Sequence, residues 1–244
     1  VEDLFVANTL SYILFFTNKG RAHWLKVYVI PEASRQARGK AIVNMLNVDK
    51  DEKVTAYIPV ESFEKGFIIM GTKKGTVKKT ALENFSRPRK GGIIAINLEE
   101  SDELINVVLT EGNQQILLAT KNGMAVKFDE KNVRPTGRSS MGVRGIRLKD
   151  KDEVIGMVKS EDEGTLLTLT ENGYGKRTKV SEYRLINRGG SGVKNIVCSE
   201  RNGKVISIKS VTNDDEIFII SRKGVIIRTS AKGISVTGRN TQGV

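Results

Sequence analysis

The sequence of 244 residues is 39% hydrophobic, so the chain is long enough to bury a core as one large β domain or as two ordinary domains. It has no apolar run near the roughly 18 to 20 residues of a membrane helix and no signal-peptide pattern, and its single cysteine, Cys198, excludes an internal disulfide and a cysteine zinc site. Lysine and arginine total 40 against 28 acidic residues, and the resulting net charge of +12 favours a polyanionic partner, either nucleic acid or an anionic membrane surface.

Short apolar runs recur along the chain with a period near 50 residues and predict β-strands. These runs are Ile13–Phe16, Phe67–Met70, Ile116–Ala119, Leu166–Leu169 and Ile217–Ile220. Each run ends in a Thr/Ser-x-x-Gly turn that closes on Gly20, Gly75, Gly123, Gly173 or Gly224. Glycine suits the positive φ of a tight hairpin, and asparagine in three of the turns (Asn18, Asn122 and Asn172) predicts type I′ turns. A second strand follows each turn, as at Thr76–Thr80.

Two further markers keep the same period. A basic loop closes on Gly39, Gly92, Gly142, Gly192 and Gly243, and four of its copies carry an arginine four residues earlier: Arg35, Arg138, Arg188 and Arg239. The second copy has Pro88 at that position, between Arg87 and Arg89. An acidic turn precedes another apolar strand at Asp51-Glu52, Asp102-Glu103 and Asp152-Glu153. Three independent markers with one period indicate an internal repeat.

Repeats of this length, with about four short strands each and no amphipathic helix, predict an all-β, propeller-like fold. We expect one domain over residues 1–244, with repeats at approximately 10–60, 66–112, 114–161, 164–213 and 215–244 plus 1–9. Residues 1–9 would complete the last blade and close a ring of five, or flanking segments would supply a sixth blade. Because the chain begins at Val1 and ends within a repeat, we expect it to be part of a longer protein.

Basic residues recur at equivalent positions of the repeats. Four residues after the turn glycines stand Trp24, Lys79, Lys127, Arg177 and Arg228, so that four of five strands carry a cation on the same side. Together with the loops, these residues predict a belt of positive charge along one edge, which matches phosphates rather than bases. The aromatic content of 6% disfavours stacking on unpaired bases, so the expected ligand is duplex DNA bent along the belt. The alternative is that these charges only solvate an outer face.

The candidate DNA contacts are the basic residues of these strands and loops. They are Arg35, Arg38, Lys40, Lys79, Arg87, Arg89, Lys90, Lys127, Arg138, Arg144, Lys176, Arg177, Arg188, Lys194, Arg228 and Arg239.

Residues suited to catalysis are scarce. The only histidine, His23, lies in a predicted strand and is expected to be packed or exposed rather than catalytic. The carboxylates fall in turns, where they typically cap hairpins, and they predict no metal site. Ser191 in Gly-Gly-Ser-Gly-Val is not a nucleophile elbow, and the Gly189–Gly192 loop lacks the lysine and helix of a phosphate loop. We predict no active site in this chain.

Several segments resemble the C-terminal domain of the DNA gyrase A subunit. The similar segments are residues 1–9, 26–35, 132–148, Glu171-Asn172-Gly173-Tyr174-Gly175-Lys176-Arg177-Thr178 and Gly238-Arg239-Asn240-Thr241-Gln242-Gly243-Val244, and the likeness extends over essentially the whole chain. The resemblance implies a β-pinwheel, which is a propeller-like disc with strands exchanged between blades, and duplex DNA wrapped around its perimeter. It also implies a catalytic core on the same polypeptide and an ATPase-bearing B-type subunit in a cytoplasmic, nucleoid-associated heterotetramer. ATP and Mg²⁺ would serve that parent enzyme, and this domain would hold no cofactor or metal and bind no membrane.

One departure concerns the type of parent enzyme. Gyrase A domains carry a Gln-Arg-Arg-Gly-Gly-Lys-Gly box in the first blade, before the segment where this chain begins. The nearest internal match, Asn187-Arg188-Gly189-Gly190-Ser191-Gly192, lacks the first arginine pair and has serine for lysine, and residues 35–41 match less well. A parent with the box would introduce negative supercoils, whereas a parent without it would resemble topoisomerase IV, which relaxes and decatenates DNA.

A protein-interaction propeller is the main alternative function. One Trp and one His in the whole chain exclude the repeated Gly-His and Trp-Asp signatures of WD40 proteins. An enzyme with a site in the central funnel is a more distant alternative, since histidine is so scarce.

Overall fold

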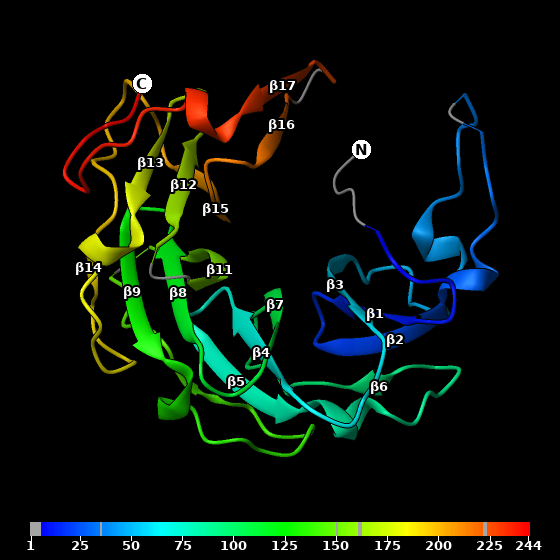
Figure 1. Ribbon diagram of the computed structural model, residues 1–244. Coiled ribbons are helices and arrows are strands. Elements are labelled where there is room, and N and C mark those ends of the chain that lie inside the picture. Colours follow the sequence, from blue (N-terminus) through cyan, green and yellow to red (C-terminus); the bar gives the residue numbers. More distant parts are fainter. Residues whose placement is uncertain (1–5, 35, 150, 161–162, 222–223) are drawn as a thin grey trace. The chain divides into compact units, whose positions relative to one another are not determined.

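The computed structural model describes residues 6–34, 36–149, 151–160, 163–221 and 224–244 (Figure 1). These residues form short antiparallel β-sheets and six short 3₁₀ helices, and no α-helix occurs among them. They divide into two compact units, which we call the N-terminal unit (residues 6–113 and 133–144) and the C-terminal unit (residues 114–132 and 145–244). None of the helices in these ranges is long and apolar enough to cross a membrane. The proposed pairing of residues 1–9 with the last repeat involves residues 1–5, which lie outside the described residues.

The N-terminal unit contains two four-stranded sheets with the same strand order. The first sheet has the order β3 (Val54–Val60), β1 (Tyr12–Thr17), β2 (Arg21–Lys26) and β6 (Ile93–Ile94). The second has the order β7 (Leu104–Thr110), β4 (Phe67–Thr72), β5 (Thr76–Ala81) and β10 (Val143–Arg144). The connections of this unit include the 3₁₀ helices η1 (Val27–Val29), η2 (Ile42–Asn44) and η3 (Leu82–Phe85).

The C-terminal unit repeats this order. Its first sheet consists of β11 (Val154–Ser160), β8 (Gln115–Thr120), β9 (Met124–Asp129) and β14 (Val193–Lys194). Its second consists of β15 (Val205–Val211), β12 (Thr165–Thr170) and β13 (Gly175–Lys179), and a hairpin of β16 (Glu216–Ile220) and β17 (Ile226–Ser230) follows. The 3₁₀ helices η4 (Glu130–Asn132), η5 (Val180–Glu182) and η6 (Ala231–Gly233) come directly after β9, β13 and β17.

The outermost strand of each complete sheet comes from the next repeat. The two-residue strands β6, β10 and β14 pair with β2, β5 and β9 of the preceding repeat. Val244 takes the equivalent place beside β13, because Gly175 N donates to the Val244 carbonyl at 2.8 Å and Val244 N to the Gly175 carbonyl at 3.0 Å. This strand exchange explains why residues 133–144 belong to the N-terminal unit although they follow β9 in the chain.

The apolar runs of the sequence form the central strands of the sheets. β1, β4, β8 and β12 each lie between two partners, and most of their residues are buried on both faces, which is why they are continuously hydrophobic. In the N-terminal unit, Leu14, Phe16, Ile68, Met70 and Phe85 belong to one core, where the rings of Phe16 and Phe85 meet edge to face. The C-terminal unit has its own core around Leu117, Leu166 and Ile208.

The hairpins differ from the type I′ turns predicted from the sequence. In each turn the glycine N–H donates to the carbonyl three residues earlier, as from Gly75 to Thr72 at 3.0 Å, and the glycine has positive φ. The described non-glycine residues with positive φ are Ser101 and Lys151, and neither lies in these turns. The four hairpins whose turn residues are all described therefore have a left-handed residue only at the last turn position, as in a type I turn with a G1 bulge. In three of the turns the threonine hydroxyl accepts the N–H that follows the glycine, for example Thr76 N to Thr72 Oγ1 at 3.1 Å.

Acidic turn residues cap these hairpins as predicted. Asp102 Oδ1 accepts the N–H of Lys74 at 2.9 Å, and Asp152 Oδ1 accepts the N–H of Asn122 at 2.9 Å. Each aspartate precedes the third strand of its sheet and joins it to the turn between the first two strands. The carboxylates in these turns thus have a structural explanation.

Candidate nucleic-acid interface

The structure separates the candidate DNA contacts by their exposure. Arg38, Lys40, Arg87, Arg89, Lys90, Arg144, Lys194 and Arg228 are exposed. Arg138, Arg188 and Arg239 are half-buried. Lys79, Lys127, Lys176 and Arg177 are buried. Arg35 lies outside the described residues.

The recurring strand position does not form a surface belt of charge. Lys79, Lys127 and Arg177 are only 4%, 6% and 3% exposed. Lys127 Nζ donates to the Val180 carbonyl at 3.3 Å, and Arg177 Nε donates to the Ile234 carbonyl at 3.0 Å. Both acceptors lie at the 3₁₀ helix of the next repeat, η5 or η6.

Trp24 explains why this position favours a long side chain with an N–H donor. It is the one non-basic member of the series, yet its Nε1 donates to the carbonyl of Phe85, at the end of η3, over 2.8 Å. Trp24, Lys127 and Arg177 therefore share a long donor that reaches a backbone carbonyl of the following repeat. The interpretation of Lys79, Lys127 and Arg177 as outward cations is corrected, because all three are buried. Lys127 and Arg177 serve as hydrogen-bond donors, since a buried polar group requires a partner.

Lys79 and Arg228 complete the series in different ways. Lys79 Nζ lies 4.3 Å from the ring centroid of Phe67, on the neighbouring strand β4. Arg228 is exposed in the β16–β17 hairpin, and its Nε donates to Glu216 Oε2 at 2.7 Å. Of the four basic residues at this register, Arg228 alone is at the surface.

Two buried lysines hold the basic loops to the strands. Lys176 Nζ donates to the carbonyls of Gly238 and Arg239 at 2.7 and 3.1 Å. Lys78, at the equivalent place in β5, donates to the Ala95 carbonyl at 2.7 Å and to the Arg138 carbonyl. Burial lowers the pKa of each ammonium group to about 8. Lys176 is among the predicted DNA contacts and Lys78 is not, although both begin a pair of adjacent basic residues in the second strand. Lys176 is thus also corrected, from a surface cation to a buried donor.

The half-buried loop arginines also bind main-chain carbonyls. Arg138 Nη1 donates to Ile94 at 3.3 Å, and Arg239 Nη1 donates to Lys194 at 3.0 Å. Ile94 and Lys194 are the second residues of exchanged strands, so these two arginines occupy equivalent environments. Arg188 Nε donates to the Asn132 carbonyl at 2.9 Å. Each side chain is positioned by its backbone acceptor and still reaches the surface.

The exposed cations lie in loops and exchanged strands. Arg87, Arg89 and Lys90 belong to the loop before β6, and Arg144 and Lys194 are the second residues of β10 and β14. Arg38 and Lys40 lie in the long connection between η1 and η2. These residues are the part of the predicted set whose positions suit contact with a polyanion.

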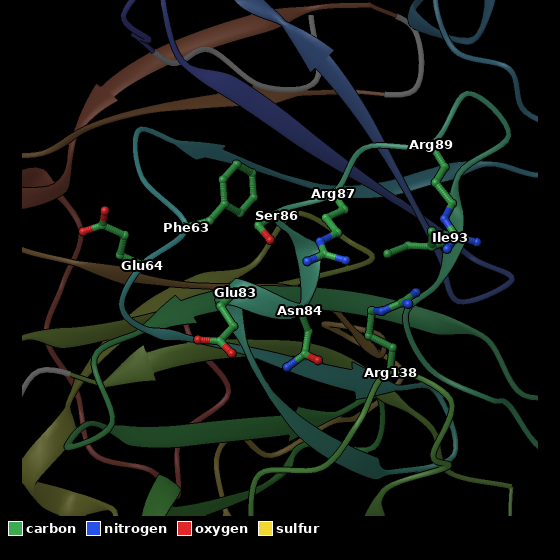
Figure 2. Close-up of a pocket in the computed structure, with 9 residues that line it drawn as sticks. All are labelled: Phe63, Glu64, Glu83, Asn84, Ser86, Arg87, Arg89, Ile93 and Arg138. Atoms are coloured by element: carbon green, nitrogen blue, oxygen red, sulfur yellow. The ribbon is translucent and has the colours of Figure 1, made fainter.

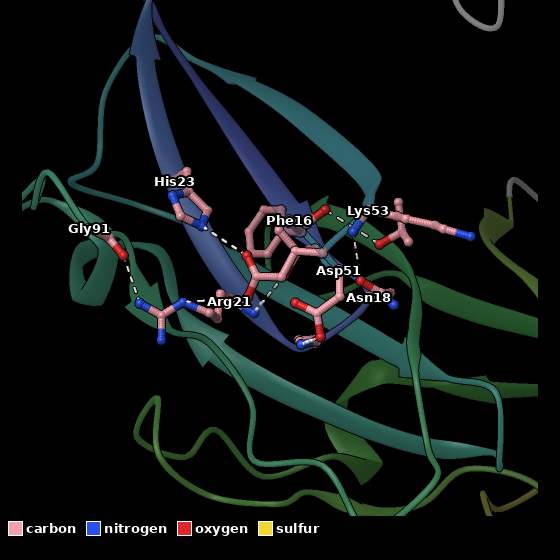
Figure 3. A network of polar contacts seen from close by, with 11 residues as sticks. Phe16, Asn18, Arg21, His23, Asp51, Lys53 and Gly91 are labelled. Carbon is pink, nitrogen blue, oxygen red and sulfur yellow. Dashed lines mark hydrogen bonds and ion pairs between the residues drawn. The ribbon is translucent and has the colours of Figure 1, made fainter. Parts of the chain in front are cut away.

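A buried polar cluster supports the loop that carries Arg87, Arg89 and Lys90 (Figure 3). His23 Nε2 lies 3.7 Å from Glu52 Oε2, Arg21 Nε lies 3.7 Å from Glu52 Oε1, and Arg21 Nη2 donates to the Gly91 carbonyl at 2.6 Å. Burial lowers the pKa of His23 and raises the pKa of Glu52. The sequence analysis expected His23 to be packed or exposed, and it is packed. Its partner Glu52 is buried, unlike an ordinary solvated turn acid.

Other groups considered from the sequence form no visible constellation. Among the described residues, no cluster of three or more His, Cys, Asp or Glu side chains could hold a metal ion. Ser191 is exposed, and Cys198 is a free thiol whose pKa is raised by burial.

A family model and the similar proteins agree on one family for this chain. The model of the family "DNA gyrase C-terminal domain, beta-propeller" matches residues 11–61, 66–111, 114–161, 164–212 and 215–244. The chain is 49% identical to the DNA gyrase A subunit of Salmonella typhimurium and 56% identical to that of Halalkalibacterium halodurans, in each case over 100% of this chain but only 28% and 29% of the relative. The chain therefore spans under a third of the length of these relatives.

Solved structures agree in fold. The C-terminal domain of a DNA topoisomerase IV has a TM-score of 0.88 at 29% identity, covering 97% of this chain and 75% of that one. The C-terminal domain of a DNA gyrase A has a TM-score of 0.85 at 24% identity, covering 98% of this chain and 78% of that one. These likenesses confirm the all-β, propeller-like fold and the resemblance noted in the sequence. The chain belongs to the DNA gyrase C-terminal domain family of β-propellers.

Proposed function

We propose that this chain is the duplex-DNA-binding domain of a bacterial type IIA topoisomerase A-type subunit, and that it bends or wraps DNA without catalysing a reaction itself. The observation that carries the proposal is the family membership of a chain with a net charge of +12. Its exposed cations recur in the loops and exchanged strands of successive repeats, which supports contact with a regularly charged polymer.

Phosphate contact is the mechanism that these residues support. Arginine and lysine side chains at exposed loop positions neutralise phosphates without reading bases, so affinity would depend weakly on sequence and steeply on salt. Bending a duplex costs free energy, and each further phosphate contact offsets part of that cost. The surface candidates for these contacts are Arg38, Lys40, Arg87, Arg89, Lys90, Arg138, Arg144, Arg188, Lys194, Arg228 and Arg239.

The role in a larger enzyme follows from the relatives, which are DNA gyrase A subunits. We propose that the repeats form a single DNA-binding domain beside a catalytic core on the same polypeptide. This domain would present a bent duplex to that core. The core would act with an ATPase-bearing B-type subunit in the bacterial cytoplasm, at the nucleoid. ATP and Mg²⁺ would be used by the parent enzyme and not in this domain.

Gyrase is the preferred parent, since the similar curated proteins named above are gyrase A subunits. The loop 187–192 lacks the arginine pair and the lysine of the gyrase box, so any box of the parent lies outside these 244 residues. If this domain wraps DNA with a fixed hand, the parent enzyme would introduce supercoils; if it does not, the parent would only relax and decatenate DNA.

A topology assay tests this proposal. Nicked plasmid is ligated with increasing amounts of the domain and deproteinised, and its linking-number distribution is read on a gel. A dose-dependent shift of one sign is the expected result and supports wrapping with a fixed hand. Salt-sensitive binding without a linking change supports a domain that holds or bends DNA, as in a topoisomerase IV-like parent. The absence of any duplex binding would contradict the proposal and favour a protein-interaction propeller.

A further inference from the structure

We propose that a recess in the N-terminal unit, lined by Arg87, Arg89 and Arg138, is a binding site for phosphates of the DNA backbone. This inference rests on the proposed function and goes beyond it. It assigns the strongest contact to one built site, and it predicts that one neutral residue beside the arginines, Asn84, keeps the site open to anions.

The recess brings together cations from two different loops. A pocket of about 590 Å³ is lined by the three arginines together with Asn84, Glu64 and Glu83, among other residues. Figure 2 shows the guanidinium groups of Arg87, Arg89 and Arg138 directed towards one another, while the two carboxylates lie on the other side of the pocket. A neighbouring pocket of about 470 Å³ shares Arg89 and Arg138 and adds Arg21.

Backbone contacts hold the arginines in place. Lys78, which is 1% exposed, donates to the Arg138 carbonyl and to Ala95, and Arg138 Nη1 donates to Ile94. On the other loop, Arg21 Nη2 donates to the Gly91 carbonyl. Both loops are therefore fixed before a ligand arrives, which reduces the ordering cost of binding.

The three arginines of the recess outnumber its two carboxylates, Glu64 and Glu83. Within the described ranges, neither the Arg87 nor the Arg89 side chain forms a hydrogen bond or an ion pair. Like charges that share one pocket repel each other, and an anion between them removes this cost. Guanidinium groups present paired N–H donors that match phosphate oxygens, so phosphate is the anion that fits best.

A corresponding place in the C-terminal unit has a carboxylate at the position of Asn84. Glu182 is the third residue of η5, as Asn84 is the third residue of η3. Glu182 Oε2 accepts the N–H of Arg239 at 3.3 Å, and Arg239 corresponds to Arg138. In that unit the protein supplies its own carboxylate beside the loop arginine. An anion site is therefore expected beside Asn84 and not beside Glu182.

Two variants of the domain test the recess. Asn84→Glu copies the C-terminal unit and keeps every arginine, whereas the double variant Arg87→Gln/Arg89→Gln removes the two unpaired cations. Asn113→Glu, at an exposed turn of the same unit outside the recess, is the matched control for adding one carboxylate. Binding of a short linear duplex is followed by fluorescence anisotropy over a series of salt concentrations, and circular dichroism verifies that each variant is folded.

We expect Asn84→Glu to weaken duplex binding about tenfold or more, while Asn113→Glu changes it little. The arginine double variant should also flatten the plot of log affinity against log salt by about 0.9 for each phosphate that is no longer neutralised. If Asn84→Glu and Asn113→Glu weaken binding equally, only net charge matters and the recess proposal is wrong although the proposed function stands. If the unsubstituted domain binds no duplex, both fail.

A titration with inorganic pyrophosphate separates DNA from a small anion as the ligand. Weak pyrophosphate binding that disappears in Asn84→Glu, together with a fall in duplex affinity, supports a phosphate-binding site that the DNA backbone occupies. Tight pyrophosphate binding with unchanged duplex affinity in Asn84→Glu would overturn the assignment to DNA and leave a site for small phosphates.

Discussion

Not every basic residue of this domain is placed to contact DNA, because some are exposed and others are buried. Arg87 and Arg89 are exposed without partners among the described residues, whereas Arg177 and Lys176 are buried donors to backbone carbonyls. All four are candidate DNA contacts in the sequence analysis. Their surroundings decide whether the charge meets solvent or serves a hydrogen bond inside the fold.

Lys78 gives a pH-dependent contribution to stability. Its pKa is about 8 in the folded state against 10.5 for an ordinary lysine, so between these pH values the unfolded chain binds more protons. Stability should therefore rise with pH across this window by up to about 1.4 kcal/mol per pH unit for this group. We expect the difference in unfolding free energy between the unsubstituted domain and Lys78→Met to grow from pH 8 to 10 in urea titrations. A difference that does not change with pH would contradict the buried, deprotonating ammonium.

Gly92 occupies a position that only glycine fits well. Its φ is +70°, and a Cβ there would lie 2.6 Å from His23 Cε1 and 2.9 Å from the Ala22 carbonyl oxygen. We expect Gly92→Ala to lower the unfolding free energy by about 2 kcal/mol or more, because both the left-handed backbone and the packing resist a side chain. Gly91→Ala is the matched control: nothing lies within 4 Å of its Cβ, and we expect a change within about 0.5 kcal/mol in denaturant unfolding.

At the scale of elements, a side-chain donor from the second strand of three repeats reaches the 3₁₀ helix of the next: Trp24 of β2, Lys127 of β9 and Arg177 of β13. Arg177 illustrates it best, since its Nη1 also donates to Asn213 Oδ1 at 2.8 Å. We expect Arg177→Met to destabilise the domain by about 2–4 kcal/mol, because the carbonyl of Ile234 and the amide of Asn213 lose their partner. The exposed Arg228→Met should cost no more than about 1 kcal/mol in the same urea titration. Equal effects would show that burial does not distinguish the two arginines.

Charge reversal at Lys79, Lys127 or Arg177 would therefore disturb folding before it tests DNA binding. Exposed positions such as Arg144 and Lys194 are better probes of the interface.

The sequence predicted the first three strands of the first four repeats because their apolar runs and turn residues are strong local signals. The central strands β1, β4, β8 and β12 each contain the predicted apolar run and extend one or two residues beyond it. It could not assign the turn type, since a glycine with positive φ suits both a type I′ turn and a G1 bulge. The exchanged strands were known only through the family resemblance: β6, β10 and β14 have two residues each, too few for any periodicity. Nor could periodicity tell Lys194 at the surface from Lys176 in the interior, because long-range partners decide which is buried.

For the whole molecule, exchanged strands predict that the last residues matter for the C-terminal unit. Removal of Gly243 and Val244 deletes both hydrogen bonds between Val244 and Gly175. In hydrogen-exchange measurements we expect the amide of Gly175 to lose protection, while Val77, paired with Val143 in the N-terminal unit, keeps its protection. Unaltered exchange at Gly175 would show that the terminal pair contributes nothing to this sheet.

Strand exchange also has a consequence for the order in which the domain folds on the ribosome. The sheet that begins with β4 at Phe67 is complete only when β10 at Val143–Arg144 has emerged, after most of the following repeat has been synthesised. Until then β5 has an unpaired edge, and because β8 and β9 are synthesised before β10, two consecutive sheets are unfinished at the same time. A pause in translation between β9 and β10 should therefore prolong the exposure of both sheets, whereas a pause just after β10 leaves only the newer sheet incomplete.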